Sequence, residues 1–104
     1  MPIVNEKTTS YITISFRDKN GQLALPAAIT YRLDCLSNGI VVVADTVVAP
    51  ATIIEVTMTP NQNAIINNTN SKENKRLTVT ASYGASDSIT SQYDYEVLNL
   101  SGII

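Results

Sequence analysis

Residues 75–83 read Lys-Arg-Leu-Thr-Val-Thr-Ala-Ser-Tyr, and this stretch decides the fold class. Apolar and polar side chains alternate along it. Successive side chains of a β-strand point to opposite faces, so this period of two gives one apolar face and one polar face. The stretch therefore predicts a half-buried strand, with Leu77, Val79, Ala81 and Tyr83 directed inward.

The same alternation recurs in four other segments of the chain, which are residues 9–17, 28–34, 53–58 and 89–99. Each segment is expected to be a strand with one face towards a shared core. The expected inward residues are Ile12, Ile14, Phe16, Ile29, Tyr31, Leu33, Ile54, Val56, Met58, Ile89, Tyr93, Tyr95 and Val97.

Residues 40–48 predict a strand of a different kind. Val41, Val42 and Val43 are consecutive, so apolar groups lie on both faces. Such a strand is expected to be central in its sheet or covered by something outside the domain. Residues 22–25 are a candidate for a short additional strand.

The spacing of these segments indicates the architecture. Short strands joined by Gly, Pro and Asn turns, without a long helical pattern, predict an immunoglobulin-like antiparallel β-sandwich of about seven strands. A small β-barrel is the alternative. Residues 9–100 would form this domain, with an N-terminal arm at 1–8 and an apolar C-terminal tail at 101–104.

Two segments between the predicted strands have other signals. Residues 59–66 indicate a single helical turn, with Thr59 as the N-cap and Pro60 as the first helical residue. Residues 67–74 are polar and show no periodicity. They predict the longest and most mobile loop of the chain.

Composition excludes several classes of function. Of the 104 residues only 15% are charged, and the net charge of −2 offers no basic field for nucleic acid. The sequence has no His, which is the usual general base and the commonest metal ligand. We expect no enzymatic activity, no catalytic residue, and no cofactor or metal. The single cysteine, Cys35, cannot form an intramolecular disulfide and is expected to be buried.

The sequence also bears on location. Residues 1–7 lack the basic start and the apolar run of a secretory signal. No apolar stretch approaches the ~20 residues of a membrane-spanning helix. We therefore expect a soluble protein that is made in a cytoplasm and does not bind membranes.

Two acidic patterns were weighed as candidate sites. Asp94 and Glu96 lie two residues apart on a polar strand face, which could in principle suit a glycosidase carboxylate pair. A solvated face balanced by Lys or Arg is the favoured interpretation. Residues 18–21, Asp-Lys-Asn-Gly, resemble the opening of a calcium loop but lack its later ligands, so a plain turn is expected.

Two groups of residues are candidates for contacts with a partner. Tyr83, Tyr93 and Tyr95 are a possible aromatic cluster, serving either as cross-strand packing or as a sugar-binding platform. The ends of the chain are apolar, and these possible docking arms are Pro2, Ile3, Val4, Ile103 and Ile104. We expect the arms either to dock on a neighbouring subunit or to fold back on the domain.

Beyond residue 28 the order of motifs carries a family resemblance. The motifs are Ile-Thr-Tyr-Arg-Leu-Asp at 29–34, Val-Val-Ala-Pro-Ala-Thr at 47–52, Pro-Asn-Gln-Asn-Ala-Ile at 60–65, Arg-Leu-Thr-Val-Thr-Ala-Ser-Tyr-Gly at 76–84 and Tyr-Asp-Tyr-Glu-Val-Leu-Asn-Leu at 93–100. Together they resemble a family of small immunoglobulin-like proteins encoded among the structural genes of tailed bacteriophages and prophages.

The resemblance implies a virion component that is placed on the capsid, at the head–tail connection or on the tail. Its expected partners are other capsid, collar or tail subunits, bound in several copies through sheet edges and apolar arms. Synthesis in the bacterial cytoplasm followed by release on lysis would explain a surface rich in Thr, Ser and Asn without an export signal. A carbohydrate-binding or adhesive module for host-surface glycans is the alternative.

Overall fold

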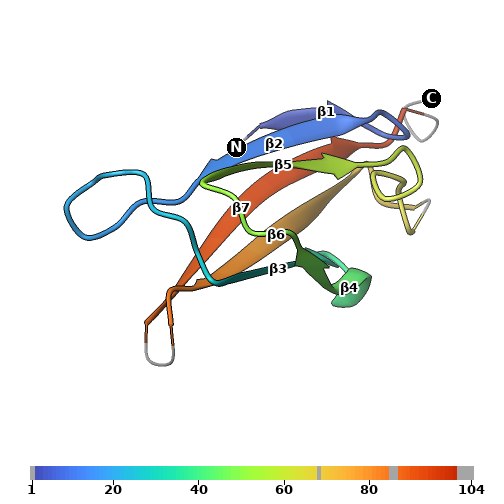
Figure 1. Ribbon diagram of the computed structural model, residues 1–104. Helices are drawn as coiled ribbons and strands as arrows, with labels where there is room; N and C mark the ends of the chain where they lie inside the picture. Colours follow the sequence, from blue (N-terminus) through green and yellow to red (C-terminus); the bar gives the residue numbers. More distant parts are fainter. Residues whose placement is uncertain (1, 68, 85–86, 101–104) are drawn as a thin grey trace.

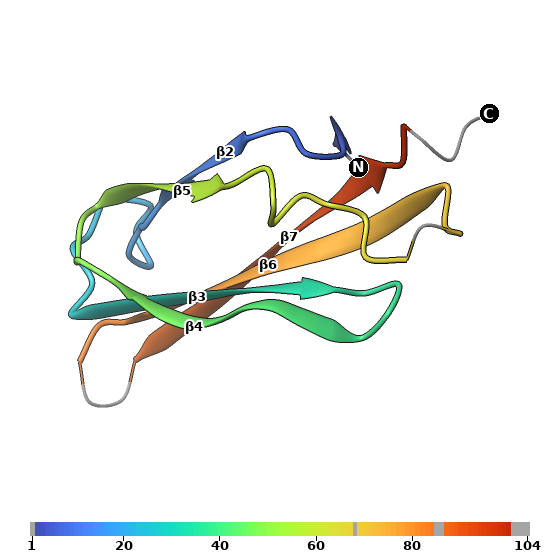
Figure 2. The same ribbon diagram turned by 90° about the vertical axis from the view of Figure 1, so that its right-hand side faces the viewer.

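The computed structural model describes residues 2–67, 69–84 and 87–100, and these form seven strands in two sheets (Figure 1). The sheets pack face to face as an open sandwich and do not close into a barrel, so the predicted all-β sandwich is confirmed (Figure 2). The strands are β1 (Ile3–Asn5), β2 (Ser10–Ser15), β3 (Ala28–Cys35), β4 (Ile40–Val48), β5 (Ile53–Met58), β6 (Lys72–Ser82) and β7 (Ser88–Leu98).

The larger sheet has the strand order β1-β7-β6-β3-β4, and the smaller one contains β2 and β5. All neighbouring pairs are antiparallel except β1 and β7, which run parallel. The prediction of a purely antiparallel fold is therefore wrong at this one pair. Residues 3–5 were expected in an arm outside the sheet, yet their backbone pairs with Glu96, Val97 and Leu98.

The sheet assignment of β2, β3, β6 and β7 matches an immunoglobulin-like sandwich, whereas β4 differs from the fourth strand of the constant type because it joins the larger sheet beside β3. The smaller sheet lacks the strands that usually flank its two central ones. Both long edges of the β2–β5 sheet are therefore open among the described strands.

The core lies between the two sheets, where the alternating residues predicted from the sequence meet. Burying this apolar surface is the main stabilising contribution to the fold. The deeply buried apolar side chains of this core include Ile29, Leu33, Met58, Leu77, Val79, Ala81, Tyr95 and Val97, each no more than 3% exposed. Cys35 is also buried and is not in a disulfide, as expected.

Strand β6 begins earlier than the polar composition of its first residues predicts. Lys72–Asn74 belong to the strand and pair with the end of β7, whereas the sequence indicated a loop there. The reason is that Glu73 points inward and receives several hydrogen bonds, which offset the cost of burying a carboxylate. A periodicity of apolar residues cannot detect a strand whose inward residue is charged.

Strand β4 is at the edge of the larger sheet and not at its centre. Its pairing with β3 shifts register twice, which indicates β-bulges, and Val41 and Val47 stay 48% and 80% exposed. Residues 22–25 form only an isolated bridge between Arg17 and Leu23 and no additional strand.

The predicted turn at residues 59–66 is present as a capped single turn and not as a regular helix. The N–H of Gln62 donates to the Thr59 hydroxyl at 3.3 Å, and the Gln62 side chain accepts from the Thr59 N–H at 2.9 Å. These reciprocal bonds fix the turn. As a result Asn63 is held in the interior beneath the loop.

Candidate interaction surface

The first half of β7 exposes a face that should belong to the core. Ile89, Ser91 and Tyr93 lie opposite Ala81, Val79 and Leu77 of β6, all of which are buried. Cross-strand partners point to the same side of a sheet, so these β7 side chains face the sandwich interior. They are nevertheless exposed, Ile89 to 43% and Tyr93 to 39%. In both overall views the β6–β7 hairpin projects away from β2 and β5 (Figures 1 and 2).

Strand β2 presents an open edge beside this exposed face. The N–H of Phe16 donates to Thr52 of the segment that leads into β5, so the even-numbered residues of β2 bond towards β5. Tyr11, Thr13 and Ser15 consequently direct their backbone N–H and C=O groups away from β5. An unpaired strand edge of this kind is a template for pairing with another chain.

A hollow of about 450 Å³ lies between the β2 edge and β7. We call it the β2–β7 trough and define it by its lining residues. None of them is charged, and the core residues Leu77 and Val79 are among them. The lining residues are Tyr11, Ile12, Thr13, Ile14, Ser15, Leu77, Val79, Ser91, Gln92 and Tyr93.

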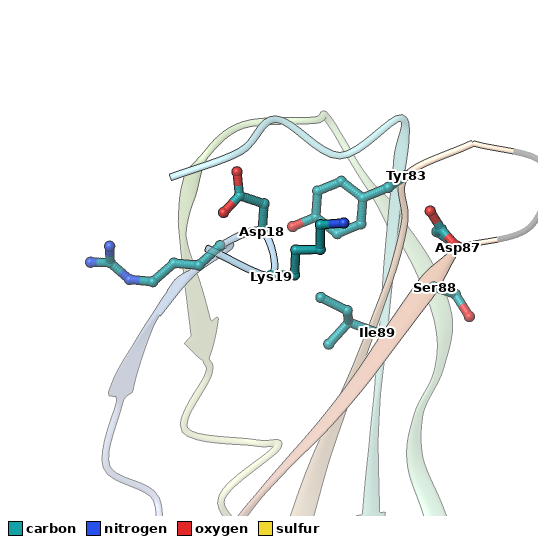
Figure 3. Close-up of a pocket in the computed structure, with 7 residues that line it drawn as sticks. Asp18, Lys19, Tyr83, Asp87, Ser88 and Ile89 are labelled. Carbon is teal, nitrogen blue, oxygen red and sulfur yellow. The ribbon is translucent and has the colours of Figure 1, made fainter. Parts of the chain in front are cut away.

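A second hollow of about 590 Å³ follows further along the same two segments, and we call it the turn hollow (Figure 3). It is lined by Arg17, Asp18, Lys19, Tyr83, Asp87, Ser88 and Ile89. Along the chain, residues 87–89 of the turn hollow come just before residues 91–93 of the trough. The residues after β2, 17–19, follow those of the trough, 11–15. The two hollows therefore follow one another along the uncovered part of β7.

The turn hollow includes Asp18, the first residue of the turn that resembles the opening of a calcium loop. Asp18 is engaged by its own turn, because its carboxylate accepts from the N–H groups of Asn20 and Gln22 at 2.8 and 3.1 Å. Gly21 has a positive φ of 80°, which favours Gly in this turn. Residues 18–21 form the plain turn that the sequence predicts. Among the side chains drawn in Figure 3, the Tyr83 hydroxyl has no hydrogen-bond partner within the described residues.

The three candidate tyrosines have different environments. The rings of Tyr93 and Tyr95 are 6.3 Å apart at their centroids and tilted by 40°. Tyr95 is buried and donates to the Asn63 side chain at 2.7 Å, and its burial raises the pKa of the phenol well above the ordinary value. Tyr83 lies six residues beyond Leu77, the partner of Tyr93, which is about 20 Å along a strand. Only Tyr93 of the adjacent pair is available to a partner.

The apolar N-terminal arm folds back on its own domain. The Pro2 carbonyl accepts from the Glu96 N–H at 2.9 Å, and Val4 packs against the core. Ile3 stays 60% exposed on the other face of β1. Ile103 and Ile104, the other predicted docking residues, lie outside the described residues.

The paired carboxylates of β7 are balanced by basic residues, as the favoured interpretation expected. The Asp94 carboxylate accepts two hydrogen bonds from Arg76, at 2.7 and 2.9 Å, and these bonds lower its pKa. Glu96 lies 3.5 Å from the Lys72 amine. Both carboxylates are engaged on a solvent-facing strand surface, which gives no arrangement for acid and base catalysis.

A buried polar cluster, which sequence reasoning missed, closes the opposite end of the sandwich. Glu73 accepts hydrogen bonds from the N–H groups of Ile66 and Asn67 and from the side chains of Asn38 and Asn70. Burial alone would raise the pKa of Glu73, but these bonds outweigh burial and lower it. The carboxylate has a structural role, because it holds residues 66, 67 and 70 of the segment before β6.

Lys75 shares the inner face of β6 with Glu73. Its side chain is 0% exposed, and its amine has no hydrogen-bond partner among the described residues. Burial lowers the pKa of Lys75, while the nearby Cys35 and Glu73 only partly oppose this effect. Glu73 and Lys75 have the same parity on β6 as the inward residue Leu77. Parity was the only feature of the sequence that pointed to their burial, and their charge argued against it.

Within the described part of the chain no group of three or more Cys, Asp or Glu residues is placed to hold a metal ion. Nor does that part contain a helix that is long and apolar enough to cross a membrane. No family model, curated protein or solved structure matches this chain. The fold and the surface define the class as an all-β sandwich module with an open sheet edge.

Proposed function

We propose that this protein is a non-enzymatic structural or accessory component of a tailed-phage virion, which acts through contacts with other capsid, collar or tail subunits. It is made in the bacterial cytoplasm and joins the particle during assembly, in several copies. The observation that carries the proposal is the β2–β7 trough, where an unpaired strand edge borders exposed core-type residues.

The exposed edge of β2 is suited to contacts with another chain. Strands with unpaired backbone groups beside apolar side chains tend to pair with other chains, and proteins usually protect such edges with Lys, Pro or a covering segment. Residues 10–15 of β2 contain neither Lys nor Pro. Exposed apolar residues on β4, including Val41 and Val47, add a second contact surface. Both surfaces fit a protein that works within an assembly.

Particle composition tests the proposal. Phage or prophage particles released by lysis from bacteria that carry this gene would be purified on a density gradient and analysed by quantitative mass spectrometry. We expect peptides of this chain in the particle band, at a fixed ratio to the major capsid or tail protein. An abundant host cytoplasmic protein serves as the control for adhering material. Intact particles without this chain, with all of it in the soluble lysate, would contradict the proposal.

The alternative of a glycan-binding module has one supporting observation. Tyr11, which is 65% exposed, and Tyr93 both line the trough, and aromatic rings are common sugar-binding platforms. A glycan array probed with the wild type and with Tyr93→Ala tests it. Tyr95 is unsuitable for substitution here because it is part of the core. Signals that disappear in Tyr93→Ala would favour glycan binding, and an array without signal at high protein concentration would remove it.

A further inference from the structure

The smaller sheet is one strand short at the β2 edge. In the immunoglobulin arrangement a flanking strand lies beside the equivalent of β2, on the side away from β5. The described residues supply no strand for this position, because β1 joins the larger sheet beside β7 instead. The vacant position coincides with the β2–β7 trough.

The backbone of β2 determines what kind of molecule fits the trough. Tyr11, Thr13 and Ser15 direct N–H and C=O groups into it at the regular spacing of an antiparallel or parallel ladder. Another extended polypeptide presents donors and acceptors at this same spacing. The main-chain bonds of an added strand supply affinity, and pockets for alternate side chains supply selectivity.

The lining determines the chemistry of the occupant. All ten lining residues are uncharged, and the buried Leu77 and Val79 are among them. A charged side chain that points inward from an added strand would lose its hydration without gaining a partner. An apolar side chain would instead bury itself against Leu77, Val79 and Tyr93. Alternate positions of the occupant, which face solvent, are free to be polar.

We propose that the trough accepts an uncharged, extended segment of a neighbouring virion subunit, which adds to β2 as a further strand and covers the exposed inner face of β7. This inference deepens the proposed function and rests on it. The segment has apolar side chains at alternate positions and no proline among the residues that pair with β2. It completes the smaller sheet in the way that a missing flanking strand would.

The first test uses the purified full chain and a defined probe, the peptide acetyl-Lys-Thr-Val-Thr-Val-Thr-Val-Thr-Lys-amide, whose charges lie outside the alternating stretch. Amide hydrogen exchange is read by NMR. We expect the amides of Tyr11, Thr13 and Ser15 to slow at least tenfold with millimolar peptide. Those of Ile12 and Ile14 should change little, because they already bond towards β5. The control peptide has Asp in place of the central Val and should give no slowing.

A protein variant checks the same geometry. Thr13→Pro removes an N–H from the open edge only, so the domain should remain folded while peptide binding falls at least tenfold. Urea unfolding confirms the fold of the variant, and Thr57→Ser on β5 is the matched control. Three results would each overturn the inference. The first peptide could leave amide exchange unchanged, the Asp peptide could slow exchange equally, or folded Thr13→Pro could bind the first peptide as well as the wild type does. Slowing at the same amides that depends on protein concentration without peptide would instead assign the occupant to a second copy, which also overturns it.

Particle incorporation separates this inference from the proposed function. If the wild type enters particles and Thr13→Pro does not, both stand. If both proteins enter equally, the trough is not the contact surface, although the virion role is retained. If the wild type itself is absent from particles, the proposed function fails, and the exchange experiment still decides whether the trough binds a strand.

Discussion

At the scale of single residues, the least expected feature is the pair of charged side chains within the core of β6. Glu73 is surrounded by donors, whereas the amine of Lys75 has none of the acceptors it would need among the described residues. Buried polar groups are normally hydrogen-bonded, and an unpaired one costs stability. The two residues should therefore respond to substitution in opposite directions.

Substituting Glu73 by Gln should destabilise the domain by about 3 kcal/mol, because a single amide oxygen cannot accept all the hydrogen bonds that the two carboxylate oxygens accept. Urea unfolding at pH 7 measures the change. The exposed Glu55→Gln on β5 is the control and should shift stability by less than about 0.5 kcal/mol.

The stability lost in Glu73→Gln should depend on pH. The pKa of Glu73 is lowered in the folded state, so its contribution is present above the ordinary value of 4.5 and is lost as pH falls through the folded pKa. The stability difference between wild type and Glu73→Gln should be full at pH 7 and shrink below pH 4.5. A difference that stays constant down to pH 3 would show that the carboxylate charge is not involved.

Substituting Lys75 by Met should raise stability by about 1–3 kcal/mol, because a thioether of similar length replaces a buried amine without a partner. The pKa of Lys75 is lowered in the folded state, so the unfolded chain binds more protons between that pKa and 10.5. The wild type should accordingly gain stability as pH rises towards 10, and the Met variant should lack this gain. Lys72→Met, at an exposed position, is the control for urea unfolding at pH 7 and 9.5.

At the scale of elements, β1 shows how a three-residue strand can join a sheet. Its first two residues face opposite environments, since Val4 packs on the core and Ile3 is largely exposed. The parallel ladder to β7 sets this orientation. The strand was hidden in the sequence because three residues are too few to show a period.

The asymmetry of β1 gives a matched pair of variants. Val4→Ser should lower the free energy of unfolding by about 1–2 kcal/mol, because it removes apolar packing from a partly buried site. Ile3→Ser should change it by less than about 0.5 kcal/mol. Thermal unfolding followed by circular dichroism would distinguish them, and equal effects would mean that β1 does not pack as described.

At the scale of the whole molecule, the two sheets cover one another incompletely. The core is closed where the β2–β5 sheet and residues 59–67 lie over the larger sheet, and it is open along the first half of β7. The inner face of β7 is thus exposed in the first half of the strand and buried in the second half. Only the placement of the other sheet causes this change.

Lysine substitutions along β7 test the incomplete cover. Ile89 and Val97 have the same parity, but Ile89 is 43% exposed and Val97 is fully buried. Ile89→Lys should keep the fold with a change below about 1 kcal/mol, whereas Val97→Lys should prevent folding at 25 °C, because it buries an unpaired charge. Circular dichroism and urea unfolding would show the contrast, and similar losses at both sites would mean that the strip near Ile89 is covered.

The amino-acid sequence was enough to predict the all-β class, the inward parity of the main strands and the turn at residues 59–66. These features depend on side-chain periodicity and turn chemistry, which are local. The burial of Cys35 and the pairing of Asp94 and Glu96 with basic residues were also foreseen, because both follow from residue type and strand parity.

Long-range packing, which local patterns do not contain, sets which strands are edges, where β6 begins and that β1 pairs with β7. The same packing leaves Ile89 and Tyr93 exposed, although both point to the inner side of their sheet. A side chain is buried only when a second surface packs against the face on which it lies. A strand's pattern shows which face is apolar, but only the position of the opposing sheet determines whether that face is covered.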